Sequence, residues 1–360
     1  MDAKICSKII AKRIENVLPN IIHYSQTAYV KDRSIWEGLR LIDDILLFTK
    51  ENNIPGILLT IDFEKAFDSV EWNFLFRVLE SLNFGDTLIR WIKTLYKNSS
   101  SCVMNRGLST GYFPLGRGVR QGDPLSPYLF IICLEVLLNH IRLSKDIKGL
   151  SIEQTQIKLS AFADDLTLFL DSEHSAYEVF SLIKTFSGFS GLKVNKAKCE
   201  ALWLGSNKDR EDFPLDIRWP KAIKILGIVF SYNTNEMFRQ NFTKNLNSMR
   251  DLSNIWAQRS LSILGKISII KCFLIAKMNF VCTAIHTPAS VIKEVNSIIF
   301  KFLWNGMDKV KRKATIGTYE EGGLKMIDFE SFVRTKHIMW IKRLLYGPAH
   351  DWKIIPNAFL

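Results

Sequence analysis

An α+β fold with an antiparallel sheet is predicted for the first two-thirds of this chain, and helices are predicted for the rest. Short apolar runs typical of buried strands alternate with stretches of helical periodicity, and an acidic pair divides one run into two strands. The predicted strands cover 57–61, 159–170 (as two strands), 200–204 and 223–230, and the predicted helices cover 1–50, 70–97, 126–142 and 178–189. This order is typical of α+β proteins with an antiparallel sheet.

The helix over 126–142 has the clearest boundaries. Ser126 is expected as its cap and Pro127 as its first residue, because proline is favoured in the first turn. Almost all of its side chains are apolar, so it is expected inside a domain. Elsewhere, Asp86 is expected to cap a helix and Gly191 to end one.

Strand signals fade after about residue 233, which places a domain boundary near 232. Residues 239–313 carry thirteen Lys or Arg against three Asp or Glu, with aromatic residues interleaved. Basic side chains can follow phosphates, and aromatic rings can stack on bases. For most of the rings, however, helical spacing makes a position in a helix core the simpler explanation.

The charge of the chain indicates a polyanionic partner. The chain has 360 residues, a formal net charge of +12 at pH 7 and 47% apolar residues. The apolar content is enough for a sizeable core. The charge favours either nucleic acid or an anionic membrane surface as a partner. Charge alone leaves both open, together with a protein that merely happens to be basic.

Cysteine usage and the length of the apolar runs favour an intracellular protein. None of the six cysteines forms a C-x-x-C pair or lies near a histidine at zinc-finger spacing, so reduced thiols are expected. No secretory signal opens the sequence. The longest apolar run, 128–141, is too short to cross a bilayer. We expect a location in the nucleus, the cytoplasm or both, no secretion and no membrane partner.

Three aspartates stand at the ends of strand-like runs. Asp62 follows the run 57–61, and Asp164 and Asp165 lie at the tip of the predicted 159–170 hairpin. If these strands are neighbours, the three carboxylates meet at one sheet edge, where their repulsion favours bound cations. Phosphoryl transfer commonly uses two divalent ions roughly 3.5–4 Å apart, and Mg²⁺ prefers carboxylate oxygens. A polar turn explains an isolated Asp-Asp pair more simply, but the apolar residues flanking this pair favour the metal site.

One loop and one aromatic residue could contact a substrate beside these aspartates. Arg120 and Gln121 offer hydrogen bonds to a nucleotide, and Gly122 allows close approach of the backbone. An ordinary loop that caps a helix explains the same residues. Phe67 lies five residues after Asp62, where a bulky ring could exclude a sugar 2′-hydroxyl and select deoxynucleotides. Among 24 phenylalanines, a core position is the simpler explanation.

Several motifs resemble the reverse transcriptases of non-long-terminal-repeat (LINE-type) retrotransposons. They are DFEKAFDSV at 62–70, GVRQGDPLSP at 118–127, FADD at 162–165, GLKVNKAKC at 191–199 and ILGI at 225–228. Two downstream segments, 256–271 and 322–324, resemble regions that follow the polymerase in the same elements. Each motif alone is moderately specific, whereas five in this order along nearly the whole chain are highly specific.

The resemblance implies a right-hand polymerase with fingers, an antiparallel palm sheet and a thumb. Fingers and palm would occupy 1–232, a helical thumb-like region 233–305 and a C-terminal extension 306–360. The implied activity is that of an RNA-directed DNA polymerase, a nucleotidyltransferase. Its partners would be an RNA template, a DNA primer and dNTPs, and its cofactor two Mg²⁺ ions, with Mn²⁺ as a possible substitute.

The resemblance also assigns roles to residues. Asp62, Asp164 and Asp165 would be the catalytic, metal-binding carboxylates. The substrate-binding residues would be Phe63, Lys65, Ala66, Phe67, Arg120, Gln121, Gly122, Lys198 and Arg33. Within this set the Phe63 carbonyl is a further possible metal ligand, and the amides of Lys65 and Ala66 would lie near the triphosphate. Phe67 would select the sugar, Lys198 (or Lys193) would protonate the leaving pyrophosphate, and Arg33 would lie near template or nucleotide.

Departures from the family pattern leave other functions open. Part of the fingers sequence usual before the position of Lys4, an upstream endonuclease domain and a downstream Cys/His knuckle are missing. We therefore expect a fragment of a larger polyprotein or the product of a decayed element. The alternative function is a catalytically inactive, nucleic-acid-binding remnant of a retroelement, and maturase-like help in RNA folding is a third.

Overall fold

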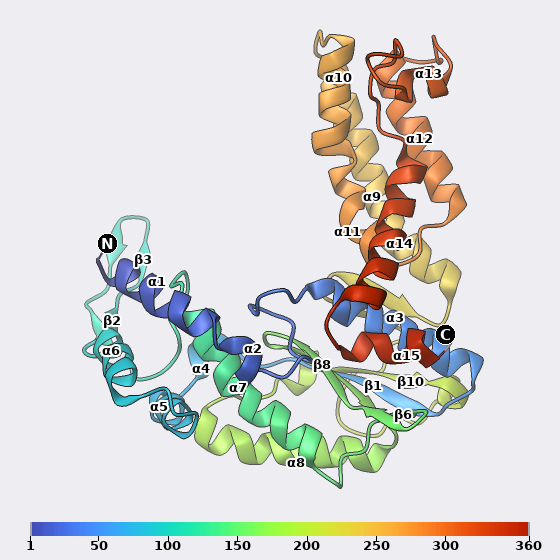
Figure 1. The fold of residues 1–360 in the computed structure, drawn as a ribbon. Coiled ribbons are helices and arrows are strands. Elements are labelled where there is room, and N and C mark those ends of the chain that lie inside the picture. Colours follow the sequence, from blue (N-terminus) through green and yellow to red (C-terminus); the bar gives the residue numbers. More distant parts are fainter. Residues whose placement is uncertain (1, 359–360) are drawn as a thin grey trace. The chain divides into compact units, whose positions relative to one another are not determined.

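The computed structural model describes residues 2–358, without the side chain of Asp2, and these residues form two compact units. Unit 1 contains the residues up to Lys221 together with a returning segment that starts at His350, and unit 2 spans Ala222–Ala349. Unit 1 mixes helices with a sheet, whereas long helices dominate unit 2 (Figure 1). The α+β class and the helical character after residue 233 are therefore confirmed.

A four-stranded antiparallel sheet organises unit 1. The strand order is β10 (Glu200–Leu204), β1 (Gly56–Ile61), β9 (Asp165–Leu170) and β8 (Leu159–Phe162). Nearly all side chains of β1 are buried, which explains its unbroken apolar sequence. Helix α8 (Glu173–Ser190) packs against β9 on the lower side of the sheet in Figure 1, and α3 (Ile35–Glu51) packs against β8 and β10 on the upper side.

The other elements of unit 1 surround this sheet. The remaining helices are α1 (Asp2–Glu15), α2 (Leu18–Ile21), α4 (Ala66–Ser69), α5 (Trp72–Ser81), α6 (Asp86–Tyr96), α7 (Ser126–Leu143) and α15 (Ile354–Ala358). Three two-stranded ribbons pair β2 (Ser100–Ser101) with β5 (Phe113–Pro114), β3 (Met104–Asn105) with β4 (Leu108–Ser109), and β6 (Leu150–Ile152) with β7 (Thr155–Ile157). Short 3-10 turns are η1 (Lys196–Lys198), η2 (Gly205–Asn207) and η4 (Asp351–Lys353).

Helix α7 lies in the core, as its apolar sequence predicts. Every residue from Leu129 to Leu134 is fully buried. With 18 residues the helix is longer than its continuous apolar run, and by length and composition it could cross a membrane. Its burial inside unit 1 matches a core helix, which passes the same test.

Two expected helix caps are wrong by one position. Leu125, not Ser126, caps α7, because Asp123 already turns the chain: its Oδ1 accepts a bond from the Leu125 amide at 3.3 Å. Gly85, not Asp86, caps α6, with a φ of +78° that suits glycine. Gly191 ends α8 in the left-handed conformation, as expected.

Unit 2 consists of a hairpin and a bundle of helices. The hairpin strands are β11 (Ala222–Ile225) and β12 (Ile228–Ser231), and the helices are α9 (Thr234–Ala257), α10 (Ile263–Ile269), a π-helical turn η3 (Ile270–Leu274), α11 (Ala276–Ala284), α12 (Ala289–Trp304), α13 (Arg312–Ile316) and α14 (Phe329–Tyr346). The single strand predicted over 223–230 is wrong, because Leu226 and Gly227 both adopt positive φ and reverse the chain. The resemblance of 225–228 to a hairpin of the family is confirmed. The Asn241 side chain bonds the amide and the carbonyl of Val229 at 2.9 and 2.7 Å, which ties the hairpin to α9. The compact boundary thus lies at 221/222, whereas the sequence places it near 232.

Lys266, in one of the segments that carry the family resemblance, has a structural position in unit 2. Its side chain is buried, and Nζ donates to the Leu303 carbonyl at 3.3 Å and to Asn305 Oδ1 at 2.5 Å. Both acceptors lie at the C-terminal end of α12, where a cation satisfies helix carbonyls and complements the helix dipole.

The segment that starts at His350 completes unit 1. Both η4 and α15 pack against α3, and His350 Nε2 lies 3.4 Å from the Glu37 carboxylate. The Trp352 side chain is buried, and the Tyr24 hydroxyl hydrogen-bonds the Asp351 carboxylate. Of the residues assigned from sequence to a C-terminal extension, those from His350 onward pack in unit 1, whereas α13 and α14 belong to unit 2.

We expect Asp351→Asn to raise the free energy of unfolding at pH 7 and to leave it nearly unchanged at pH 4. Burial raises the pKa of Asp351 to about 6, although the Tyr24 hydrogen bond and the Arg142 charge oppose it. A carboxyl with a raised folded pKa favours folding only while protonated, so this contribution is lost as pH rises from about 4 to about 6. Denaturant unfolding at both pH values should give a difference of about 1–3 kcal/mol at pH 7. A variant that is equally destabilised at both pH values contradicts this account, and the exposed Asp146→Asn provides the control.

Candidate active site

The pairing of β1 with β9 brings the predicted aspartates together. The two strands are antiparallel, and Ile61 faces Leu166. The next residue after Ile61 is Asp62, and the residue before Leu166 is Asp165, so both stand at the same end of the sheet. The condition on which the sequence prediction depended, that these strands are neighbours, is met.

Asp164 reaches this sheet end through a tight turn. Phe162 of β8 pairs with Asp165 of β9, which leaves only Ala163 and Asp164 in the connection. Ala163 has a φ of +54°, a left-handed conformation that costs a non-glycine residue roughly 1–2 kcal/mol. The sequence predicted the hairpin but not this strained residue.

The three carboxylates repel one another. Partial burial raises the pKa of Asp165 to about 6, and the charges of Asp164 and Asp62 add to the increase. The pKa of Asp164 is raised by burial foremost and by the Asp62 charge as well. Asp62 Oδ2 is buried and accepts no hydrogen bond from the described residues, although Lys198 Nζ lies 3.8 Å away. These carboxylates thus form a site at which a bound cation would relieve repulsion.

The carboxylates of Asp62, Asp164 and Asp165 are suitable ligands for a divalent metal ion. In this structure, however, their oxygens are not arranged around one ion position. Among residues 2–358, no three Asp, Glu, His or Cys side chains are arranged to hold an ion directly. Two features support the fit: the buried Asp62 Oδ2 without a hydrogen bond, and the raised pKa values of Asp164 and Asp165. Hard carboxylate oxygens with room for water are the ligands that Mg²⁺ prefers.

The segment after Asp62 runs beside the 193–195 segment. The Asn195 amide donates to the Asp62 carbonyl at 2.8 Å, and the Glu64 amide donates to the Lys193 carbonyl at 2.8 Å. This pairing brings η1, and with it Lys198, to the side of Asp62. The structure therefore places Lys198 beside Asp62, and its role as a proton donor stays a prediction.

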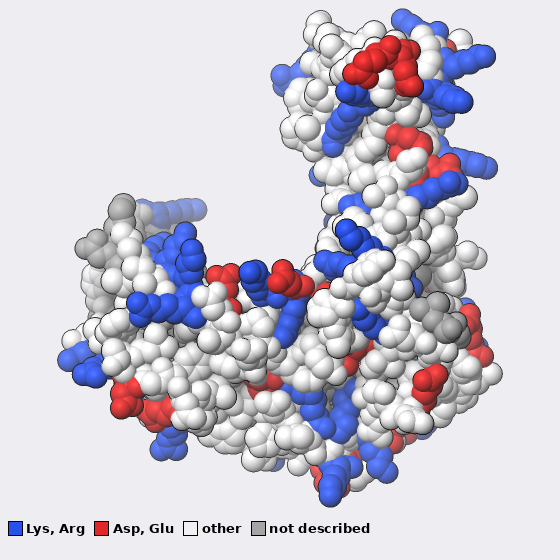
Figure 2. Space-filling model, viewed as in Figure 1, with Lys and Arg blue, Asp and Glu red and all other residues white. Residues whose placement is uncertain are grey.

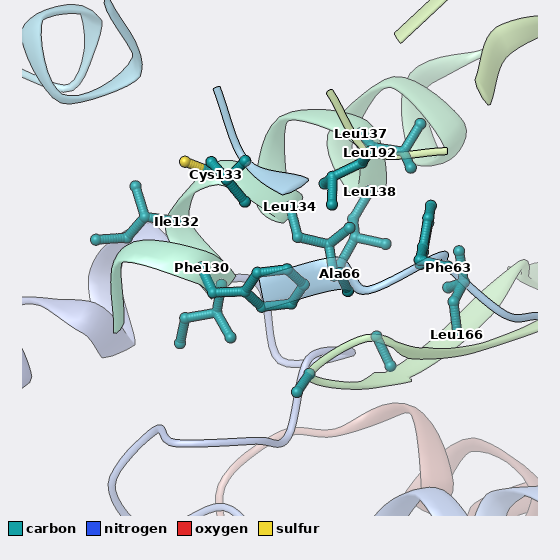
Figure 3. Close-up of a cluster of buried hydrophobic side chains, with 14 of the residues drawn as sticks. Phe63, Ala66, Phe130, Ile132, Cys133, Leu134, Leu137, Leu138, Leu166 and Leu192 are labelled. Atoms are coloured by element: carbon teal, nitrogen blue, oxygen red, sulfur yellow. The ribbon is translucent and has the colours of Figure 1, made fainter. Parts of the chain in front are cut away.

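The residues that follow Asp62 pack in the same hydrophobic core as helix α7. Phe63 and Ala66 are buried in one hydrophobic cluster with α7 side chains that include Phe130 and Leu134. Figure 3 shows Ala66 near these two side chains and Phe63 near Leu166. Phe67 is only partly buried, and its ring stacks on Phe130 with centroids 4.3 Å apart and planes 16° apart. Phe67 is thus held by the core while part of its surface is exposed, and its role in sugar selection stays a prediction.

Lys65 adopts a left-handed conformation with a φ of +45° just before α4. The Phe67 carbonyl in α4 accepts from the Val119 amide at 2.7 Å, which joins α4 to the loop before α7. In that loop, Gly122 has a φ of +77°, and Gln121 donates to Asp68 at 3.1 Å on the exposed surface. Gln121 and Gly122 therefore stay near the segment that carries Phe67.

Two arginines expected to contact nucleotide are used by the protein itself. Arg120 donates to the Leu95 carbonyl and to Ser99 Oγ, and its guanidinium lies over the Tyr96 ring at 5.3 Å. Arg33 donates to backbone carbonyls of the loop before it, including His23 at 2.6 Å, Ile22 at 2.7 Å and Gln26 at 2.8 Å. Both guanidinium groups thus hold loops of the protein in this structure, and their contact with nucleotide stays a prediction.

Residues that the sequence did not single out also lie at the site. Tyr29 is 46% exposed and has a φ of +59°. Burial of the rest of its side chain and the nearby Asp164 charge raise its pKa. Gln26 is fully buried and bonds the turn residue Ala163. Both lie in the loop that precedes Arg33, from which the sequence analysis selected only Arg33. In sequence they look like ordinary loop residues, and only their proximity to Ala163 and Asp164, far along the chain, shows that they belong to the site.

Comparison of the sequence with known protein families gives one match that covers more than half of the chain. Residues 1–230 match the family described as reverse transcriptase (RNA-dependent DNA polymerase). The chain belongs to this reverse transcriptase family. Its motifs resemble those of non-long-terminal-repeat retrotransposons, and several of the proteins similar to it come from transposable elements.

Similar proteins come from transposable elements. This reverse transcriptase chain is 29% identical over 99% of its length to the transposon TX1 uncharacterized 149 kDa protein of Xenopus laevis, and covers 28% of that protein. It is 28% identical to the Pol polyprotein of the type-1 retrotransposable element R2 of Popillia japonica, over 54% of this chain and 27% of that protein. The chain thus spans less than a third of these relatives.

Among solved structures, apo telomerase from Candida tropicalis shares the fold. The likeness has a TM-score of 0.50 at 13% identity and covers 98% of this chain and 60% of that one. With the family match, it supports the right-hand polymerase fold predicted from the sequence. Identity this low carries the fold alone.

Proposed function

We propose that this reverse transcriptase chain is an RNA-directed DNA polymerase that extends a DNA primer on an RNA template. The main support is the pairing of β1 with β9, which gathers Asp62, Asp164 and Asp165 at one end of the sheet. Because the chain belongs to the reverse transcriptase family, the reaction that we assign to this cluster is the transfer of a nucleotide to the primer.

Asp62, Asp164 and Asp165 would hold two divalent ions, Mg²⁺ or in its place Mn²⁺, with the Phe63 carbonyl as a further possible ligand. When bound, these ions supply electrostatic stabilisation of the attacking and leaving oxygens in phosphoryl transfer. Lys198, at 3.8 Å from Asp62, would donate a proton to the leaving pyrophosphate. The backbone amides of Lys65 and Ala66 would bind the triphosphate, and Phe67 would contact the sugar.

The nucleic acid would bind through positive charge. Lys and Arg side chains outnumber acidic ones by 48 to 36 in the whole chain. Figure 2 shows basic side chains gathered beside α1 and around α12 and α13. In these places Lys4, Lys8, Lys12, Arg13, Lys309, Lys311, Arg312 and Lys313 are exposed. Such side chains neutralise phosphates without reading sequence, so binding should weaken steeply with salt.

Primer extension tests this proposal. Purified protein, a DNA primer annealed to RNA, dNTPs and Mg²⁺ should give labelled DNA products, and a mixture without template should give none. Salt-dependent binding of the primed RNA without extension in either Mg²⁺ or Mn²⁺ contradicts the proposal and supports the inactive, nucleic-acid-binding remnant.

A further inference from the structure

A side chain from outside the sheet holds the turn that carries the two adjoining aspartates. Gln26 is 0% exposed. Its Oε1 accepts a hydrogen bond from the Ala163 amide at 2.9 Å, and its Nε2 donates to the Ala163 carbonyl at 3.2 Å. One buried amide thus satisfies both backbone groups of the residue that begins the turn.

The backbone around Gln26 is fixed independently. The Ala161 amide donates to the Ser25 carbonyl at 2.8 Å, and the Thr27 amide donates to the Ala161 carbonyl at 2.9 Å, so the segment runs beside β8. Arg33 donates to the Gln26 carbonyl at 2.8 Å. Because its backbone is hydrogen-bonded on both sides, the Gln26 side chain holds the Ala163 backbone at a fixed distance from this segment.

Only a side chain with a donor and an acceptor at this length can make both bonds. Ala163 is left-handed, a conformation that its own sequence disfavours, so external bonds are needed to keep it there. Gln26 Oε1 also accepts from the Ala28 amide at 3.0 Å, which fixes which end of the amide faces the Ala163 N–H. Methionine fills a similar volume but makes neither bond, and an ionised glutamate accepts but cannot donate.

We propose that Gln26 is a positioning residue that sets the placement of Asp164 and Asp165 by clamping the Ala163 peptide groups. This inference rests on the proposed function, in which these two aspartates are catalytic. Gln26 itself contacts neither substrate nor metal in this role. It acts only through the backbone of the turn.

The decisive experiment compares Gln26→Met with Thr27→Val in the full chain. Thr27 is the matched control, since its buried hydroxyl donates to the Ala161 carbonyl at 3.3 Å in the same segment but does not touch the turn. Hydrogen exchange of the Ala163 amide, without metal or nucleic acid, should become about tenfold faster in Gln26→Met and stay unchanged in Thr27→Val. Unchanged exchange at Ala163 in Gln26→Met, or an equal increase in both variants, overturns the proposal.

Binding and kinetics supply the second measurement. Titration with Mn²⁺, followed by electron paramagnetic resonance, should show about tenfold weaker binding in Gln26→Met than in Thr27→Val. In primer extension, kcat should fall by about tenfold or more while the KM for dNTP changes little, because positioning affects the transition state rather than nucleotide binding. A KM effect with unchanged kcat and Mn²⁺ affinity overturns the proposal.

An asparagine variant guards against misfolding of Gln26→Met. Gln26→Asn keeps an amide without adding a buried charge but is one methylene shorter, so it should lose the bonds to Ala163 and change exchange and Mn²⁺ binding as Gln26→Met does. Faster exchange throughout β1 in Gln26→Met would show general unfolding, in which case Gln26→Asn decides: Mn²⁺ binding equal to wild type overturns the proposal. Exchange and Mn²⁺ binding need no polymerisation, so they remain informative even if wild-type protein fails to extend primers.

Discussion

Asp164→Asn is expected to abolish primer extension while leaving the fold of the reverse transcriptase intact. The change keeps the size of the side chain but removes one of three carboxylate charges at the end of β1 and β9. Electrostatic stabilisation lost at a two-metal site amounts to several kcal/mol, so we expect the rate to fall by about a thousandfold or more. Single-nucleotide incorporation under saturating dNTP measures this effect.

The same substitution should make the folded protein no less stable. Burial and the Asp62 charge raise the pKa of Asp164, so the ionised carboxylate is unfavourable there without a cation. Asp146→Asn, at an exposed site away from the strand ends, should keep wild-type activity. Extension that survives in Asp164→Asn removes this carboxylate from the catalytic role.

Phe67→Ala is expected to increase incorporation of ribonucleotides relative to deoxynucleotides by about ten- to a hundredfold. The ring stacks on the buried Phe130 at 4.3 Å, so it is held rigidly, while part of its surface is exposed. A rigid ring can exclude a sugar 2′-hydroxyl, whereas alanine leaves space for it. Competition between dNTP and rNTP at one template position gives the ratio directly.

Phe76→Leu is the matched control for Phe67→Ala, since Phe76 is also partly buried in unit 1 but lies on α5 under Lys93. It should leave the sugar preference unchanged. If Phe67→Ala lowers total activity and preserves the preference, Phe67 is a packing residue, which was the simpler explanation from its sequence.

The sheet and its acidic end could be predicted because each rests on local sequence. The apolar run before Asp62 and the apolar residues on both sides of Asp164 and Asp165 have the length and composition of buried strands. The adjacency of these strands stayed a condition of the prediction, because β1 and β9 are far apart in the sequence and only the fold pairs them. Gly191 ends its helix because glycine adopts the left-handed conformation without a penalty.

The uses of Arg33 and Arg120 could not be predicted, because their acceptors are backbone carbonyls fixed by the fold. Arg33 bonds carbonyls seven to eleven residues before it, and Arg120 bonds the Leu95 carbonyl 25 residues away. A loop arginine looks the same in sequence whether it binds a phosphate or a carbonyl. The clamp by Gln26 was missed for the same reason, since 137 residues separate it from Ala163.

The packing of η4 and α15 on α3 has a consequence for the order of events during synthesis. Helix α3 is made early, but its contacts with Asp351–Lys353 and Ile354–Ala358 require that all of unit 2 be translated first. Closing so long a loop costs entropy and slows folding. On the ribosome, the N-terminal unit should therefore remain incomplete, with Trp352 and Ile355 absent from its core, until the final residues of this sequence leave the exit tunnel.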